Sequence, residues 1–257
     1  IPMLRHYLRN QSIVASVSRH QSGQKSLRTR NLDTRALRNY ASPALLEQVP
    51  STAASNTQKI VRDDIIWPLQ PYTEKRRTHF YPMRREMKNK RRIFLGPCGN
   101  IIFENYDLVW MQVHEMIYAE LAGSSADHEE VIEDQILAFN PLIPQGSELV
   151  FTFMLEIPNK EKREKELATL GHIENSMYLK FGPHKVIAKP TDTDVERTDD
   201  DGITSAVHFL KFELTPEQIT DFKACTEATM GSEHPNFPHM TNLPPNTIED
   251  LKKDLRS

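Results

Sequence analysis

The strongest constraint on the fold is an alternation of large apolar residues between positions 149 and 157. The larger side chains occupy every second position, and smaller or polar ones lie between them: Leu149, Phe151, Phe153, Leu155 and Ile157 against Val150, Thr152, Met154 and Glu156. Successive side chains of a strand point to opposite faces, so the large apolar groups share one face. The segment therefore predicts a long strand beside a hydrophobic core.

Two hairpins and a second long strand accompany it. Residues 92–104 flank a turn containing Gly96 and Pro97, and residues 177–188 turn at Gly182-Pro183. Proline presets a turn dihedral and glycine accepts positive φ, so both sequences favour hairpins. Residues 206–214 alternate again, with His208 on the face of the larger apolar groups.

Helical periodicity fills most of the remaining sequence. Residues 107–122 are apolar nearly all round, which predicts a helix buried on most sides. Further helices are expected on either side of Pro82, after residues 123–125, over 160–170 up to Gly171, from Thr215 to about Thr229, and from Thr247. The order predicts one α+β domain over residues 61–257, with a mainly antiparallel sheet of two hairpins and two longer strands packed against about five helices.

The first 40 residues have a different composition. They hold seven arginines and Lys25 against Asp33, a net charge of +7, and their apolar residues fall on one side of a helix. These are features of a mitochondrial presequence, so we expect a mitochondrial matrix location and cleavage after Tyr40. A basic arm that binds RNA or anionic lipid is the alternative. Residues 41–60 are expected to form a flexible linker.

Composition limits the function of the remaining chain. The whole chain has a net charge of −3, so removing the +7 segment leaves −10 for residues 41–257. Nucleic acid is therefore not the expected partner, since phosphate binding needs a basic footprint. We expect no membrane span and no metal site, because long apolar runs and CxxC pairs are absent from the sequence. No cofactor can be assigned, because Walker, GxGxxG, GxSxG and HExxH signatures are also absent.

Three polar residues in apolar surroundings are the candidate catalytic groups: Glu104, Glu115 and His208. A buried carboxylate must find a partner or change its pKa, so Glu115 could act as an acid or base near the other two. The favoured alternative pairs Glu115 with one of the arginines of residues 76–92. His208 is similarly expected to be a core histidine with satisfied hydrogen bonds.

Four further residues are candidate binding groups: Gln112, Arg91, Arg92 and Asn140. Gln112 lies one helical turn from Glu115 on a shared side. Cys98 could be a reactive thiol if it is exposed, but we expect it to be a turn residue.

Several strings resemble those of a mostly bacterial family known as domain of unknown function 3501. They are Lys90 to Pro97, Phe103-Glu104, Gln112 to Met116, Phe139 to Pro144, Thr204 to Leu210 and His234-Pro235. The resemblance covers residues 65 to 257. It implies redox partners, because genes of this family often lie beside those of an iron-sulfur oxidoreductase and a rubrerythrin-like protein. Pro82 and Gln135 depart from the family pattern, since a helix and a glutamate are expected there.

Three functions follow as hypotheses. The first is an accessory protein of an iron-sulfur or rubrerythrin-type redox system in the mitochondrion. The second is an enzyme that uses Glu104, Glu115 and His208, which requires the three side chains to share one cleft. The third is an RNA- or ribosome-associated module that uses the basic residues 75–92; pairing of these arginines with the acidic body is the preferred alternative.

Overall fold

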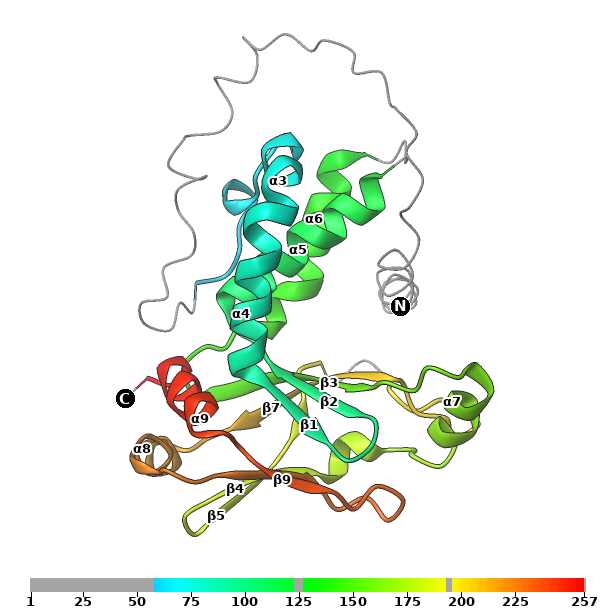
Figure 1. Cartoon of the computed structure of the whole chain (residues 1–257), viewed down its shortest axis with the longest axis vertical. Helices are drawn as coiled ribbons and strands as arrows, with labels where there is room; N and C mark the ends of the chain where they lie inside the picture. The colour runs from blue at the N-terminus through cyan, green and yellow to red at the C-terminus, as the bar shows by residue number, and fades with distance from the viewer. Residues whose placement is uncertain (1–57, 123–126, 193–195, 257) are drawn as a thin grey trace, which may run out of the picture.

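A computed structural model describes residues 58–122, 127–192 and 196–256 of the chain. The predicted presequence, its processing site and nearly all of the predicted linker lie outside these residues. The described part has three layers: a group of helices, a five-stranded sheet below it, and a four-stranded sheet below that (Figure 1). The α+β class is confirmed, and the strands divide between two antiparallel sheets instead of forming one.

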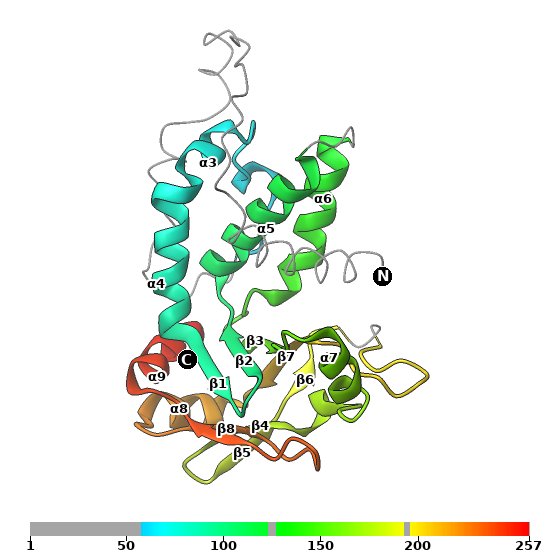
Figure 2. The same ribbon diagram turned by 45° about the vertical axis from the view of Figure 1, so that its right-hand side comes forward.

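The helical layer comes from the first half of the domain. It contains η2 (Arg62–Asp64), α3 (Gln70–Lys75), the π-helix η3 (Arg76–Phe80), α4 (Tyr81–Arg91), α5 (Tyr106–Leu121), α6 (His128–Phe139) and η4 (Asn140–Leu142). Segments α3, η3 and α4 follow one another without a break, and α4 runs directly into the first strand (Figure 2).

The upper sheet has the strand order β1-β2-β3-β7-β6. Its strands are β1 (Arg92–Leu95), β2 (Gly99–Phe103), β3 (Glu148–Leu155), β6 (Lys189–Pro190) and β7 (Val207–Glu213). The predicted first hairpin is confirmed, with Leu95 opposite Gly99, and Gly96 takes the positive φ of +60° that its turn requires.

The lower sheet has the order β5-β4-β8-β9. It consists of β4 (Met177–Phe181), β5 (His184–Ile187), β8 (Thr229–Ser232) and β9 (Met240–Asn242). The second predicted hairpin is β4 and β5. Around the sheets lie α7 (Lys160–Leu167), η5 (Ile173–Ser176), α8 (Pro216–Ala224), α9 (Pro245–Leu251) and η6 (Lys252–Asp254).

The main core lies between the two sheets and under α8 and α9. The large apolar face predicted for residues 149–157 provides its centre, because Leu149, Phe151, Phe153 and Leu155 are all buried there. Phe151 stacks on Phe212 of β7 with ring centroids 4.8 Å apart. Burial of such large side chains contributes roughly 1.5–3 kcal/mol each.

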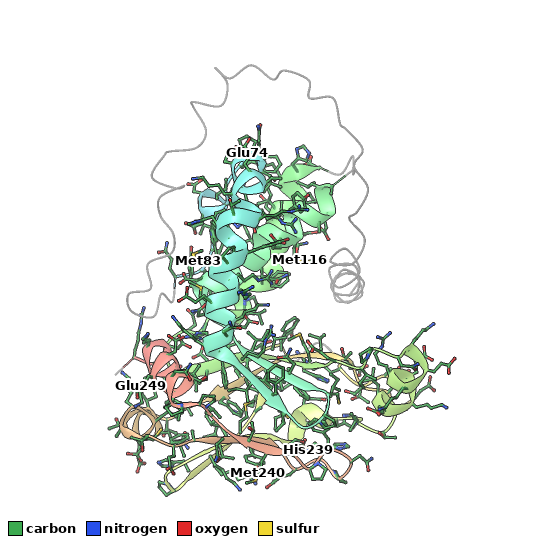
Figure 3. All side chains as sticks on the ribbon, in the orientation of Figure 1. Glu74, Met83, Met116, His239, Met240 and Glu249 are labelled. Atoms are coloured by element: carbon green, nitrogen blue, oxygen red, sulfur yellow. The ribbon has the colours of Figure 1, made fainter. Side chains whose placement is uncertain are left out.

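A second core joins the helices to the other face of the upper sheet. Val150 of β3 contributes to it, so β3 is covered on both faces. Helix α5 is its centre, and ten of its residues from Asp107 to Ile117 are buried, as its all-round apolar pattern predicts. Met83 of α4 and Met116 of α5 help to fill this helical layer (Figure 3).

Pro82 does not separate two helices. It lies in the first turn of α4, and because the helical segment continues before it, its missing N–H removes one backbone hydrogen bond. The five residues before α4, Arg76–Phe80, take the wider π conformation, in which the Tyr81 N–H donates to the carbonyl oxygen of Arg76. Proline is thus accommodated within a continuous helical segment.

Several predicted boundaries need correction. The capping box of Thr215 and Gln218 is present, but α8 ends at Ala224 because the chain turns into β8. Gly171 is not a left-handed cap; His172 has the positive φ, of 61°. A Cβ at Gly171 would lie 2.8 Å from the Gly202 carbonyl oxygen, so close backbone approach explains this glycine. No helix in the described part of the chain is long and apolar enough to span a bilayer.

Candidate functional site

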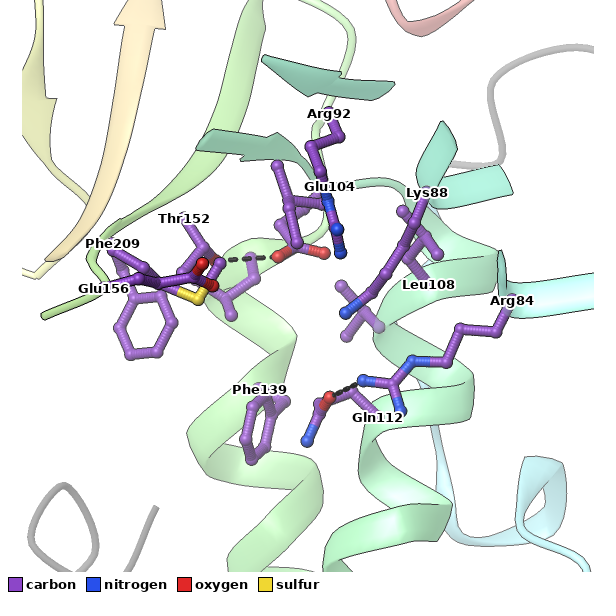
Figure 4. A pocket seen from close by; sticks show the side chains of 14 residues that line it. Arg84, Lys88, Arg92, Glu104, Leu108, Gln112, Phe139, Thr152, Glu156 and Phe209 are labelled. Atoms are coloured by element: carbon purple, nitrogen blue, oxygen red, sulfur yellow. Dashed lines mark hydrogen bonds between the residues drawn. The ribbon is translucent and has the colours of Figure 1, made fainter. Parts of the chain in front are cut away.

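A cavity of about 80 Å³ lies where α4, α5 and the upper sheet meet. Its apolar lining residues belong to the second core, and the other half of its lining is polar (Figure 4). The polar lining residues are Arg84, Lys88, Arg92, Glu104, Gln112, Thr152 and Glu156. By volume the cavity accommodates roughly six water-sized groups, which is the scale of a small metabolite.

One wall of the cavity is cationic. Arg84 and Lys88 lie one turn apart on α4, and Arg92 follows four residues later at the start of β1. The Arg84 Nη2 group donates a hydrogen bond to the Gln112 side-chain oxygen. The Nε atoms of Arg84 and Arg92 are buried without an acceptor among the described residues. Each guanidinium group therefore has an N–H that can still donate a hydrogen bond. Leaving a buried N–H without an acceptor costs free energy, so an acceptor at this place would be stabilising.

Lys88 lies between the two arginines and points into the cavity (Figure 4). Burial and the adjacent positive charge of Arg84 lower the pKa of Lys88 to about 7, although the Glu104 carboxylate opposes the shift. The amine is therefore about half neutral near pH 7, whereas an ordinary lysine is almost fully charged.

The opposite wall holds two carboxylates. One oxygen of Glu104 accepts a hydrogen bond of 2.7 Å from the Thr152 hydroxyl. Glu156 is exposed at the edge of the cavity and accepts a 2.8 Å hydrogen bond from the Asn100 amide. The cavity thus presents cations from α4 and from the start of β1, and carboxylates that directly follow β2 and β3, around a small space.

Among the predicted catalytic residues, Glu104 alone lines the cavity. Glu115 instead forms a buried ion pair with Arg76, with 2.6 Å between Nη2 and Oε2, and accepts a 2.7 Å hydrogen bond from the Tyr72 hydroxyl. Burial raises the pKa of Glu115, but the bonds from Arg76 and Tyr72 outweigh burial and hold the pKa below its usual value. The predicted pairing with an arginine of residues 76–92 is confirmed.

His208 lies on the opposite face of the upper sheet, stacked on Phe153. Its Nε2 group donates to the carbonyl oxygen of Ser205 at 2.8 Å, and burial lowers its pKa to about 4. It is enclosed, as expected of a core histidine, but only Nε2 is satisfied: Nδ1 is buried without a hydrogen-bond partner among the described residues and lies 3.6 Å from the Glu174 Oε2 atom. The structure therefore brings none of Glu104, Glu115 and His208 together at one point.

The predicted binding residues also separate. Gln112 and Arg92 line the cavity. Arg91 turns the other way and forms ion pairs of 2.7 Å with Asp250 and 2.8 Å with Asp254, so it connects α4 to the C-terminal helices. Asn140 exchanges two 2.9 Å hydrogen bonds with the main chain of Ile60 and fixes the start of the domain.

The Cys98 thiol is not activated by its surroundings. Cys98 is half-buried in the β1–β2 turn, and burial raises the pKa of its thiol, so the turn does not activate it. Across residues 58–122, 127–192 and 196–256, no group of three or more His, Cys, Asp or Glu side chains could hold a metal ion.

The cavity residues that sequence reasoning did not single out are Arg84, Lys88, Thr152 and Glu156. A signal for the first two was present, since positions 84, 88 and 92 repeat at a spacing of four and share one face of a helix. Thr152 was visible as the one hydroxyl residue of the long alternating strand. Nothing local indicates Glu156, which reaches the cavity through the register of the sheet.

Comparison with known proteins places the chain in a family. Residues 59–255 match the family described as "Protein of unknown function (DUF3501)". A crystal structure of a novel protein of unknown function from Burkholderia pseudomallei K96243 is similar, with a TM-score of 0.69 and 30% identity over 77% of this chain and 100% of that chain. No curated protein matches. The resemblance expected from the sequence is therefore confirmed, and the chain belongs to the DUF3501 family.

Proposed function

We propose that the domain binds a small oxyanion, with one or two carboxylate or phosphate groups, in the cavity between α4, α5 and the upper sheet. The observation that carries this proposal is the pair of guanidinium groups, Arg84 and Arg92, that flank Lys88 and keep buried N–H groups without an acceptor. Guanidinium groups bind carboxylate and phosphate in a bidentate manner, so an anion would supply the missing acceptors.

The carboxylate wall restricts the ligand. Glu104 and Glu156 repel a compact, highly charged anion but accept hydrogen bonds from hydroxyl, amide or ammonium groups. The favoured ligand therefore directs its anionic groups toward Arg84 and Arg92 and a neutral polar group or hydrogen-bond donor toward Glu104.

Binding can be tested by calorimetric titration of the full chain with inorganic phosphate and with succinate. Arg84→Gln and Arg92→Gln should each lower the affinity for the anion by about 10- to 100-fold, because a charged hydrogen bond contributes about 1.5–3 kcal/mol. Arg85→Gln is the matched control, since Arg85 is exposed on the same helix and does not line the cavity. An absence of binding to any small oxyanion, or an equal loss with Arg85→Gln, would contradict the proposal.

We also propose that the protein is an accessory partner of an iron-sulfur or rubrerythrin-type redox protein in mitochondria. The family resemblance supports this role. It predicts that the tagged full-length protein retains such a protein through purification from mitochondria. Repeated purifications that recover no redox protein would count against this role and would leave the anion site unaffected.

A further inference from the structure

Lys88 differs from the other cationic groups of the cavity. The described structure gives it no ion pair with a carboxylate, whereas Lys90, two residues later, forms an exposed ion pair with Glu86 at 3.0 Å. Its amine points between Arg84 and Arg92 toward the wall that carries Glu104 and Gln112 (Figure 4). A buried lysine without a paired carboxylate attracts an anion less strongly than an arginine does, because burial disfavours the charged form of the amine.

The order of the three groups suggests the shape of the ligand. A guanidinium group lies one turn before the amine on α4 and another follows it at the start of β1. A short dicarboxylate can place one carboxylate toward each arginine, which brings the atoms between its ends to Lys88. An amine held beside the centre of a ligand is suited to react with a carbonyl carbon at that position.

We propose that Lys88 forms an imine with a short 2-oxo dicarboxylic acid whose carboxylates are bound by Arg84 and Arg92. This inference rests on the proposed oxyanion site and names its ligand class. The Lys88 nitrogen lone pair attacks the carbonyl carbon, and a proton moves from nitrogen to oxygen to give a carbinolamine. Loss of the hydroxyl group with the second nitrogen proton forms the C=N bond and releases one water, with no oxidation or reduction.

Other groups facing Lys88 support this chemistry. Arg84 and Arg92 favour the neutral amine, whereas Glu104 and Glu156 favour the charged form. The Glu104 carboxylate is held by Thr152 at 2.7 Å across the cavity, where it can accept and return the proton that moves in carbinolamine formation. Near neutral pH a reactive fraction of Lys88 therefore exists without any added base.

The test is reductive trapping. The full chain is incubated with 2-oxoglutarate and cyanoborohydride at pH 7, and modified lysines are identified by peptide mass mapping. Lys88 should be modified about 100-fold faster than Lys90, since an ordinary lysine is mostly protonated at this pH. The rate at Lys88 should rise with pH to a plateau, with a midpoint near 7.

Two variants complete the design. Lys88→Arg should abolish the specific adduct, whereas Lys90→Arg should preserve both the adduct and succinate binding. Succinate binding without preferential trapping at Lys88 would overturn the imine and leave the oxyanion site intact. Trapping that is unchanged in Arg84→Gln and Arg92→Gln would overturn the proposed recognition of the carboxylates. Equal modification of exposed lysines would overturn the inference as well.

Discussion

Glu115 shows how a carboxylate on an almost wholly apolar helix is stabilised. Its partners, Arg76 and Tyr72, come from a helical segment 39 and 43 residues earlier, and the Arg76 guanidinium also lies 4.2 Å from the centroid of the Tyr118 ring. The ion pair is thus enclosed by aromatic rings. Breaking such a pair on one side leaves an unpaired buried charge, which is more costly than the net contribution of the pair itself.

We predict that Glu115→Gln destabilises the domain by about 3 kcal/mol at pH 7, because Arg76 would lose its counter-charge in a poorly solvated site. The folded pKa of Glu115 lies below the usual value of 4.5, so the carboxylate stabilises the fold at neutral pH and loses this effect as pH falls through the folded pKa. Urea denaturation of both proteins from pH 7 to pH 3 measures this. The difference should shrink at the acidic end; a constant difference would contradict the assignment.

Residue-level interpretation from sequence succeeded where one physical rule was sufficient. A carboxylate on a buried helix beside a run of arginines indicates an ion pair, and an in-facing histidine on an apolar strand indicates a core residue. The role of Lys88 could not be derived in this way. Its surroundings depend on how α4 sits over the sheet, and the spacing of residues 84, 88 and 92 alone also describes an ordinary solvated helix face.

Arg91 joins two elements from opposite ends of the domain. Its guanidinium, only 2% exposed, binds Asp250 of α9 and Asp254 of η6 and also donates to the main-chain carbonyl of Glu104 at 3.1 Å. The same side chain therefore attaches the C-terminal helices and supports the backbone of a cavity residue. Its neighbour Arg92 faces the cavity, so at this junction one arginine connects two elements and the next one lines the cavity.

Arg91→Met should destabilise the domain by about 3–5 kcal/mol, because two carboxylates lose a buried counter-charge at once. Denaturant unfolding gives the free energy, and hydrogen exchange of α9 amides should show earlier opening than in the parent protein. Arg91→Lys is the control that keeps the charge but not the paired geometry, and it should recover part of the loss. A change below 1 kcal/mol for Arg91→Met would show that α9 is held by its apolar contacts instead.

Elements with strong periodicity could be predicted, and short ones could not. The alternation of β3, the apolar surface of α5 and the capping box of α8 each identify their element from local sequence. Strands β8 and β9 have three or four residues each, and Gly231, Ser232 and Asn242 interrupt any apolar alternation. Strand β8 pairs with β4 from a distant part of the chain and β9 pairs with β8, so the local sequence did not predict either strand.

At the scale of the molecule, the division into two sheets is the feature that local patterns do not specify. Each hairpin is predicted by its own turn, but the choice of neighbours is not. Strand β4 pairs with β8, whereas β3 pairs with β7, and the large apolar side chains of both sheets face one core. A strand pattern states which face is buried, without stating which sheet covers it.

The targeting prediction also belongs to this scale. We expect the mature protein to begin at Ala41, since a segment with a charge of +7 is drawn toward the inside-negative matrix by about 2.3 kcal/mol per charge per 100 mV. N-terminal sequencing of the protein from mitochondria tests the cleavage. Deletion of residues 1–40 should alter where the protein accumulates and leave its melting temperature unchanged. Retention of Arg5 to Arg38 in the mature protein, or a lower melting temperature, would contradict the prediction.

The direct passage from α4 into β1 has a mechanical consequence. Because α4 ends at Arg91 and β1 begins at Arg92, no loop separates the helical layer from the sheet at this point. Arg84 and Lys88 therefore lie on a helix that is joined to the sheet by the single peptide bond before Arg92. A tilt of α4 would change the spacing of the three cations, so binding of the proposed anion by all three would be coupled to the angle between α4 and β1.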